Sequence, residues 1–344
     1  MSMVESSISK FVRRVTVGLF TTHKYDFHVY TAPKFAPAHD ITKNVGKQLR
    51  SRIMMKRILR LGSLALLRST STARFSTVAC EMAAHEHKFK AGSCNIPHPD
   101  KVKTGGEDAF FHDDTTLVVA DGVGGWANWG VNSGDYSRSL CNHIKKIAQD
   151  FKDDSEATPK KILVSAALRT TVVGSSTCCL ALIDKKEKKL KVANIGDSGY
   201  LIARPQADGT LSLVHISGEQ LHSFNFPYQI GTEGDAPTKA QEFEHDIEDG
   251  DIIILGTDGL FDNVDQETIL QTLSEFVEED RLVDVDNAAQ AVGNKASELS
   301  HDKDFMSPFA KKARRARYAY HGGKPDDITL ILAVAEFREV VESQ

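Results

Sequence analysis

The sequence is poor in cysteine and tryptophan and has no long apolar run. Its five Cys are odd in number and form no Cys-x-x-Cys pair, which argues against a disulfide framework or a zinc site and favours a reducing compartment. No run of about 18 apolar residues occurs, so the sequence predicts no transmembrane helix. It also lacks internal repeats and a Gly-rich loop of the dinucleotide-binding or P-loop kind.

Charge is spread unevenly along the 344 residues. Residues 1–80 hold 14 Lys and Arg against three Asp and Glu, whereas the remainder holds 28 against 44. A step of this size indicates that the two parts do different jobs. The acidic body is a poor candidate for binding nucleic acid, whose phosphates attract positively charged surfaces, so we expect no nucleic-acid partner.

The basic part is typical of a targeting segment. Residues 47–84 are rich in Arg, Ser, Leu and Ala and contain no acid before Glu81. An amphipathic, Arg-rich and acid-poor segment is typical of a mitochondrial transit peptide. The sequence therefore predicts a mostly disordered leader over residues 1–84 and a mitochondrial location, in the matrix. The alternative is a basic tail that binds anionic lipid or nothing.

Beyond residue 104, apolar strands and amphipathic helices alternate in blocks. Residues 85–104 are polar and fit a linker or an irregular first strand. The patterns predict strands at 116–120, 176–184, 190–194, 200–203, 211–216, 251–257 and 328–334, and helices at 133–150, 158–172, 266–278 and 286–299. Helices grouped between runs of hairpin strands indicate one α+β layered domain over residues 85–340, not a parallel doubly wound sheet.

Several acids stand at the ends of apolar strands. They are Asp121, Asp197, Asp258 and Asp326, with Glu107 and Asp108 ahead of a further apolar stretch. Clustered carboxylates repel one another unless cations neutralise them, and Mg²⁺ or Mn²⁺ suits such oxygen ligands. Two such ions about 3.5–4 Å apart can activate a water for attack at phosphorus. The alternative is that each Asp-Gly is ordinary turn chemistry.

The order of motifs in this region resembles that of the type 2C protein phosphatases, the PPM family. The motifs are GGEDAFF (105–111), VVADGVGGW (118–126), GSST (174–177), ANIGDSG (193–199), ILGTDGLFDN (254–263) and GKPDDITLIL (323–332). Together with MSPFA (306–310), their variants are most similar to the mitochondrial branch of the family. The resemblance covers about residues 103–335. It implies an αββα sandwich, in which two antiparallel sheets pack face to face between helices and the metals lie in a cleft at one edge.

The resemblance also implies roles for the acids, with two Mn²⁺ or Mg²⁺ ions as cofactors. It implies that Asp121 bridges the two ions, that the Gly122 carbonyl binds one, and that Asp258, Asp326 and Glu107 complete the shell. Asp108 and Asp327 would stand outside that shell, while Asp197 and Asp262 match a weaker third metal site. Asp121, Asp258 and Asp326 are the acids we expect to carry catalysis.

Two positions depart from the family pattern. Many relatives carry a His two residues after the bridging acid as the general acid, but Val123 stands there and cannot donate a proton. Slower turnover or a shifted pH profile would follow. Relatives also place a phosphate-binding Arg four residues before the Glu, where this chain has Lys103. Lys103 can bind phosphate as a point charge without the bidentate fork of Arg, or it is a solvated surface residue.

Two further features have competing interpretations. Trp126 and Trp129 either wall the cleft and hold a peptide or pack in the core under the metal loop. The run KKARRAR (311–317) is a nuclear signal, a basic dock for acidic phosphosubstrates or, as such runs most often are, a solvated helix face.

The resemblance therefore predicts a metal-dependent protein serine/threonine phosphatase. It implies hydrolysis of phosphoserine and phosphothreonine on mitochondrial proteins by a metal-activated water, without a covalent phosphoenzyme. Phosphorylated mitochondrial proteins would be its partners, and we expect a monomer. One alternative is a catalytically weak protein of the same fold that binds phosphoproteins. Another is a hydrolase of small phosphate esters.

Overall fold

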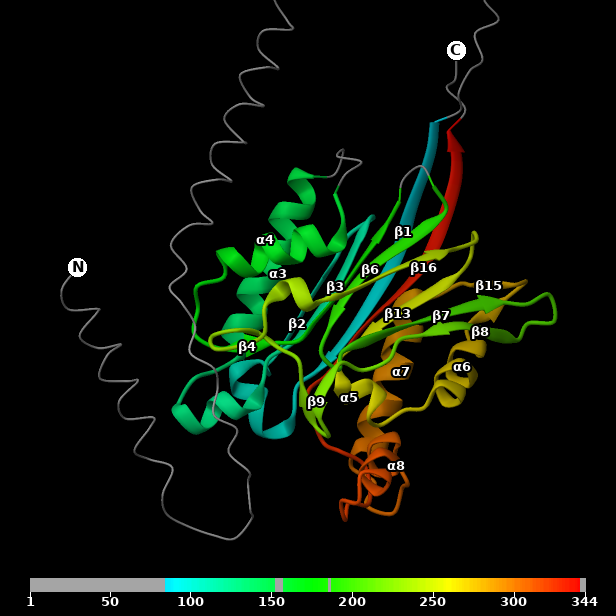
Figure 1. Ribbon diagram of the computed structural model, residues 1–344. Coiled ribbons are helices and arrows are strands. Elements are labelled where there is room, and N and C mark those ends of the chain that lie inside the picture. Colours follow the sequence, from blue (N-terminus) through cyan, green and yellow to red (C-terminus); the bar gives the residue numbers. More distant parts are fainter. Residues whose placement is uncertain (1–83, 152–156, 185–186, 341–344) are drawn as a thin grey trace, which may run out of the picture. The chain divides into compact units, whose positions relative to one another are not determined.

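Two five-stranded antiparallel sheets dominate the computed structural model, which describes residues 84–151, 157–184 and 187–340 (Figure 1). The first sheet contains, in spatial order, β1 (Ala84–Ile96), β16 (Ile328–Val340), β13 (Ile252–Gly256), β7 (Gly199–Pro205) and β8 (Leu211–Ile216). The second contains β12 (Gln241–Asp246), β6 (Lys189–Ile195), β5 (Cys178–Ile183), β3 (Thr116–Asp121) and β2 (Asp108–His112). The predicted leader lies outside the described residues apart from Ala84, and stays a prediction.

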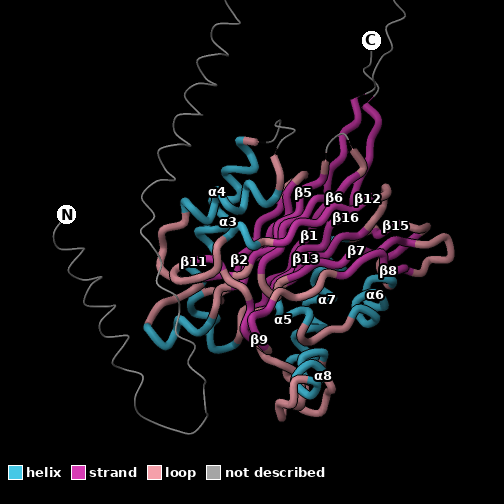
Figure 2. Tube along the Cα trace, in the orientation of Figure 1, coloured by secondary structure: helices cyan, strands magenta, loops and turns pink. Residues whose placement is uncertain are grey.

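Helices cover the outer face of each sheet (Figure 2). The second sheet is covered by α3 (Gly134–Asp150) and α4 (Pro159–Arg169), and the first by α6 (Gln266–Ser274) and α7 (Val285–Ser300). No helix in the described part of the chain is long and apolar enough to cross a membrane. The expected αββα sandwich is therefore confirmed.

Short elements join these layers. They are α5 (Asp258–Phe261) and α8 (Pro308–Arg315), the 3-10 turns η1 (Pro99–Thr104), η2 (Gly124–Trp129) and η3 (Pro237–Lys239), and the strands β4 (Ser175–Ser176), β9 (Leu221–Ser223), β10 (Phe226–Pro227), β11 (Ile230–Gly231), β14 (Val277–Glu278) and β15 (Arg281–Leu282).

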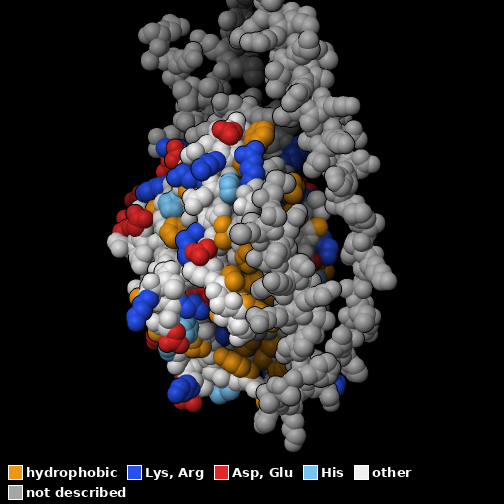
Figure 3. Space-filling model, turned by 90° about the vertical axis from the view of Figure 1, so that its left-hand side faces the viewer, with side chains coloured by type: hydrophobic (Ala, Val, Ile, Leu, Met, Phe, Trp, Pro, Cys, Tyr) orange, Lys and Arg blue, Asp and Glu red, His pale blue; other side chains and the backbone are white. Residues whose placement is uncertain are grey.

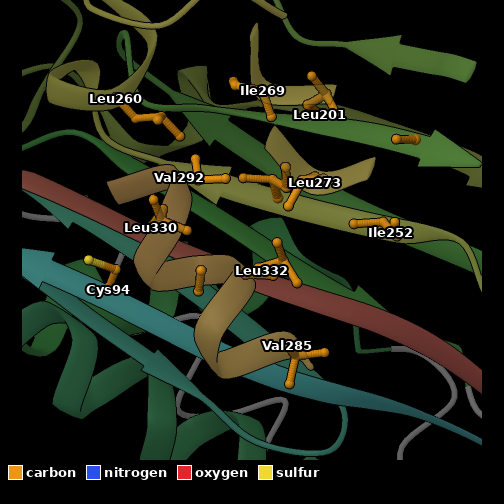
Figure 4. Close-up of a cluster of buried hydrophobic side chains, with 14 of the residues drawn as sticks. Cys94, Leu201, Ile252, Leu260, Ile269, Leu273, Val285, Val292, Leu330 and Leu332 are labelled. Carbon is orange, nitrogen blue, oxygen red and sulfur yellow. The ribbon is translucent and has the colours of Figure 1, made fainter. Parts of the chain in front are cut away.

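The core has three apolar layers, one between the sheets and one under each pair of helices. Figure 4 shows the layer under α7, where Val285 and Val292 face Leu330 and Leu332 of β16. Each fully buried side chain of this size stabilises the fold by about 1.5–3 kcal/mol relative to exposure.

The first strand is regular, which corrects the expectation of a linker or an irregular strand. β1 pairs with β16 along its whole length, from Ala84 opposite Val340 to Ile96 opposite Ile328. Side chains of a strand alternate between its two faces, so a few apolar residues suffice to seat it. Phe89 lies between the sheets and Cys94 lies under α7.

Charges of both signs are interspersed on the face drawn in Figure 3, and hydrophobic side chains gather toward its lower end. Among the described residues, the run 311–317 forms α8 and the turn after it. Arg314, Arg315 and Arg317 are exposed there, which agrees with a solvated helix face for that part of the run.

Candidate active site

The acids predicted from strand ends meet at one end of the two sheets. Asp121 closes β3 and Asp108 opens β2, where the two are register partners. Asp258 follows β13, and Asp326 precedes β16. Burial raises the pKa of Asp121, and repulsion from four neighbouring carboxylates raises it further; these are Asp258, Asp108, Asp326 and Asp197. Lys324 Nζ lies within 4 Å of the carboxylates of Asp258, Asp262 and Asp326, so acids far apart in the sequence share one small volume.

Two glycines let the chain segments of the site approach closely. The Gly122 N–H donates a hydrogen bond to the Glu107 carbonyl (3.1 Å), and a Cβ at Gly122 would come within 2.6 Å of that oxygen. A Cβ at Gly259 would lie 2.0 Å from the backbone oxygen of Asp327. Both Asp-Gly steps therefore fix the acids by bringing neighbouring backbones together.

Lys324 lies among the carboxylates at the α5 side of the site. Its Nζ is 2.5 Å from Asp258 Oδ2 and 2.7 Å from Asp262 Oδ2. Lys312 of α8 reaches Asp262 from the other side, at 2.5 Å from Oδ1. Burial acts to raise the pKa of Asp258, but the attraction of Lys324 outweighs it, so the pKa of this carboxyl is lowered.

Lys101 of η1 occupies the opposite side of the acid cluster. Its Nζ is 2.5 Å from Glu107 Oε2, 3.2 Å from Asp327 Oδ2 and 3.8 Å from Asp326 Oδ1. Lys103, which the family pattern proposes as the phosphate-binding residue, is exposed on the same turn. The structure therefore brings Lys101, rather than Lys103, into contact with the acids. Sequence reasoning missed this lysine.

The donor set fits hard divalent ions once these ammonium groups are displaced. As the side chains stand, no group of three or more His, Cys, Asp or Glu within 84–151, 157–184 and 187–340 is arranged to hold a metal ion. Lys101 and Lys324 pair with several of the carboxylates instead. Asp108 Oδ1 and Asp197 Oδ1 are nevertheless buried without a hydrogen-bond partner. Carboxylate oxygens left unsatisfied in this way are the ligands that Mg²⁺ and Mn²⁺ prefer.

Asp327 uses both of its carboxylate oxygens, and Asp108 uses one, in hydrogen bonds within the protein. Asp327 accepts hydrogen bonds from the backbone N–H groups of His98 (2.7 Å) and Glu107 (2.8 Å). Asp108 Oδ2 accepts from the Thr257 hydroxyl (2.8 Å). These contacts hold the segments that carry the other acids.

Asp326 stands at the mouth of the site, where its side chain is 26% exposed. Burial and the neighbouring Asp258 raise its pKa to about 7, against the opposing effect of Lys324 and Lys101. A carboxyl with this pKa is only partly ionised near neutral pH, and a nearby cation would favour its ionised form.

Ser133 positions Glu107 instead of capping a helix. The sequence places Ser133 at the start of α3, but its side chain makes no cap hydrogen bond there. Its hydroxyl donates to Glu107 Oε1 (2.9 Å), and the Ser137 hydroxyl donates to the Glu107 carbonyl (2.5 Å). The start of α3 thus holds Glu107 through two serine hydroxyls, a role that spacing in the sequence does not reveal.

Asn263 joins two of the motifs. Its side-chain amide donates to the carbonyls of Gly259 and Lys324, both at 2.9 Å, and its Oδ1 accepts from the Lys324 N–H (2.8 Å). The turn before Asp326 is therefore fixed to the turn after Asp258. Asn263 ends the motif 254–263, so the signal was present in the sequence although no role was assigned to it.

The loop after Asp121 carries both tryptophans of the chain, Trp126 and Trp129. The Val123 N–H donates to the Ser175 carbonyl (3.0 Å), and the Trp126 indole N–H donates to Ser175 Oγ (2.6 Å). Trp129 is 57% exposed, so of the two interpretations the one in which it packs in the core is wrong for this residue. Trp126 is half-buried. Both rings line the same pocket.

Comparisons with known proteins agree with this arrangement. The family described as Stage II sporulation protein E (SpoIIE) matches residues 112–335. Probable protein phosphatase 2C 80 of Arabidopsis thaliana is 40% identical over 250 residues, which are 72% of this chain and 58% of that protein. Protein phosphatase PTC7 homolog fig of Drosophila melanogaster is 40% identical over 253 residues, 67% of this chain and 77% of that protein.

A solved structure described as the photosystem II phosphatase PBCP is similar to this chain, with 35% identity and a TM-score of 0.64 over 72% of this chain and 98% of that one. The chain spans a little over half the length of the two Arabidopsis relatives that it matches, 58% and 54%. The similarity therefore concerns the folded body that contains the acids.

Proposed function

This chain belongs to the protein phosphatase 2C (PPM) family, and we propose that it is a metal-dependent protein serine/threonine phosphatase. The observation that carries the proposal is the convergence of Asp121, Asp258 and Asp326 from three separate strands at one end of the sandwich. Carboxylates gathered this closely repel one another, and divalent cations are the usual reason for keeping them together.

The proposal includes a set of ligands for the ions. Asp121, Asp258, Asp326, Glu107 and the Gly122 carbonyl would hold two Mn²⁺ or Mg²⁺ ions, and Asp197 and Asp262 a weaker third one. Bound there, the ions supply charge stabilisation and an activated water for an in-line displacement at phosphorus. Asp108 and Asp327 hold the backbone of the site in place through the hydrogen bonds described above.

Lys101 is the residue we assign to the substrate phosphoryl group. Its Nζ lies 2.5 Å from Glu107, yet its side chain is still 32% exposed. When cations neutralise the carboxylates, the attraction that holds this ammonium group among them weakens. Lys101 is then free to donate charge-assisted hydrogen bonds to phosphate oxygens. The Val123 side chain has no ionisable proton, so we expect no histidine-like general acid at that position.

We also propose that the substrates are phosphorylated mitochondrial proteins, in the matrix, and that a leader over residues 1–84 precedes a phosphatase domain over 85–340 in a monomer. The basic, acid-poor composition of residues 47–80 supports this location. A reporter fused behind residues 1–84 should be imported by isolated mitochondria and protected there from protease. A reporter that remains accessible would remove this part of the proposal.

The substrate class is tested by comparing phosphate release from three kinds of substrate. The full chain with Mn²⁺ is given phosphothreonine peptides, phosphoserine peptides and small phosphorylated metabolites at matched concentrations. A protein phosphatase should show the higher kcat/KM on the peptides. A preference for the metabolites would favour the small-ester hydrolase. Peptide binding without any phosphate release would favour the binding protein, with Val123 as the first residue to examine.

A further inference from the structure

A pocket of about 430 Å³ opens immediately beside the candidate active site. Val123, next to the proposed metal-binding carbonyl of Gly122, forms one end of it. Trp126 and Trp129 of η2 line one side, and the loop after β11 lines the other. Its volume is within the range of about 300–1,000 Å³ that is usual for ligand pockets.

Two of the aromatic rings that line the pocket are exposed, and a third is held in place by hydrogen bonds. Trp129 is 57% exposed and Phe226 is 52% exposed. The indole N–H of Trp126 is already used, because it donates to Ser175 Oγ (2.6 Å), whose hydroxyl donates in turn to Gln229 Oε1 (2.6 Å). These bonds fix the Trp126 ring, so it offers a ligand its face and not its polar edge.

The charged wall is acidic. Asp235 is engaged, since it accepts hydrogen bonds from His222 Nε2 (2.9 Å) and Lys239 Nζ (2.9 Å). Glu233 is exposed, and no hydrogen bond or ion pair of its side chain is found among the described residues. Its backbone has a φ of 56°, which is uncommon outside glycine and tends to occur at functional sites.

No Lys or Arg is among the residues that line the pocket. Indole faces beside a free carboxylate suit a flat cation, because the ring faces attract it and the carboxylate binds its N–H fork. We propose that this pocket binds an arginine side chain of the substrate, close in sequence to the phosphorylated residue. The proposal rests on the proposed phosphatase function.

The short separation between the pocket and the acids limits the position of this arginine in the substrate sequence. Val123 lines the pocket and directly follows Gly122 in the sequence. A short peptide can therefore place one residue in the pocket and another at the acids. An extended chain advances about 3.3–3.6 Å per residue, so three residues span roughly 10 Å. The arginine should therefore lie within about three positions of the phosphoresidue.

The kinetic test compares phosphothreonine peptides that carry arginine, citrulline or leucine at each of the three positions on either side. Citrulline keeps the shape of arginine without its charge. At one position the full chain with Mn²⁺ should show a kcat/KM at least about fivefold higher for arginine than for citrulline or leucine.

In Glu233→Gln this ratio of kcat/KM values should fall to about one, whereas Glu279→Gln should keep it. Glu279 is a matched control, being exposed with a φ of 45° and lying in the β14–β15 turn.

A spectroscopic test separates this inference from the proposed function. Both tryptophans of the chain line the pocket, so the intrinsic fluorescence of the full chain reports on it directly. Acetyl-arginine amide should change the emission in a saturable way without any metal, and acetyl-leucine amide should not. Absence of phosphate release with this response intact would overturn only the phosphatase assignment. Equal responses to the two amides, or an arginine preference that survives in Glu233→Gln, would overturn the arginine site.

Discussion

Lys324 is one of the lysines whose ammonium group lies against the proposed metal ligands. Its side chain is 16% exposed and pairs with Asp258 and Asp262. In Lys324→Met the Asp258 carboxylate loses its paired cation, whereas Asp262 keeps Lys312. Breaking a buried pair costs about 3–5 kcal/mol. We expect that loss in urea unfolding without metal, and recovery of most of it with saturating Mn²⁺.

Lys103→Met is the control for this experiment, because Lys103 is exposed and its substitution should leave the unfolding midpoint unchanged. A Lys324→Met variant that is destabilised equally with and without Mn²⁺ would show that the ion does not take over the role of the ammonium group.

Substitution of Lys101 should weaken the reaction with a phosphopeptide, whereas substitution of Lys103 should not. In Lys101→Met, kcat/KM for a phosphothreonine peptide should fall about 10- to 100-fold, because a hydrogen bond to a charged group contributes about 1.5–3 kcal/mol. Lys103→Met should stay within about twofold of the unaltered chain. Initial-rate measurements over a range of peptide concentrations decide between them. The reverse order of effects would return the phosphate-binding role to Lys103.

The acids could be located from the sequence, but their neutralising lysines could not. Asp121 and Asp258 follow apolar strands and precede glycine, which is a local signal. Lys101 contacts Asp327, 226 residues away, through a 3-10 turn that begins beyond His98. Its role depends on that tertiary contact, so a fixed spacing before Glu107 pointed to Lys103 instead.

At the scale of secondary-structure elements, β1 and α7 pack too closely to admit a side chain at Gly92. A Cβ there would lie 2.8 Å from the Val285 carbonyl and 2.9 Å from Asp286 Cα. Gly92→Ala should lower the free energy of unfolding by about 1–3 kcal/mol, the usual effect of overpacking. Gly218→Ala is the control, since a Cβ there meets nothing within 4 Å. Equal urea midpoints for the two variants would contradict this close packing.

The edges of the two sheets meet at a pair of histidines. His215 of β8 and His245 of β12 have ring centroids 4.3 Å apart, and His245 Nε2 lies 2.7 Å from the Tyr200 hydroxyl. Burial lowers the pKa of both, and their mutual repulsion lowers that of His245 further.

Because the folded pKa is below the unfolded value of about 6.5, protonation favours the unfolded chain, and stability should fall as the pH drops through and below that value. His245→Gln keeps a polar group beside Tyr200 but does not titrate. Its urea midpoint should therefore fall less between pH 7.5 and 5.5 than that of the unaltered chain. Parallel pH profiles would argue that this pair has no part in the loss.

Elements with strong apolar runs were predictable, and those with weak runs were not. β3 and β13 are buried on both faces and appear as continuous apolar segments. β12 is an edge strand that pairs only with β6, and its residues alternate only between exposed and half-buried. The pairs β9–β10 and β4–β11 are two or three residues long, which is too short for any period to register.

At the scale of the whole molecule, the fold and the position of the acid cluster follow from motif order over about residues 103–335. The pocket beside the cluster does not, because it is formed by η2 and the loop after β11, which are separated by about a hundred residues. Resemblance to this family thus predicts the acids, whereas the residues that we propose to select a substrate are found only from the structure.

The most direct test of the account is phosphate release from a phosphothreonine peptide by the full chain, measured as Mn²⁺ is titrated after treatment with a chelator. We expect no release without metal and saturable release with it. We also expect a loss of at least about a hundredfold in Asp258→Asn, which keeps the shape of the side chain but removes one ligand charge. Release that persists in the chelator, or an Asp258→Asn variant as active as the unaltered chain, would contradict the assignment of these acids.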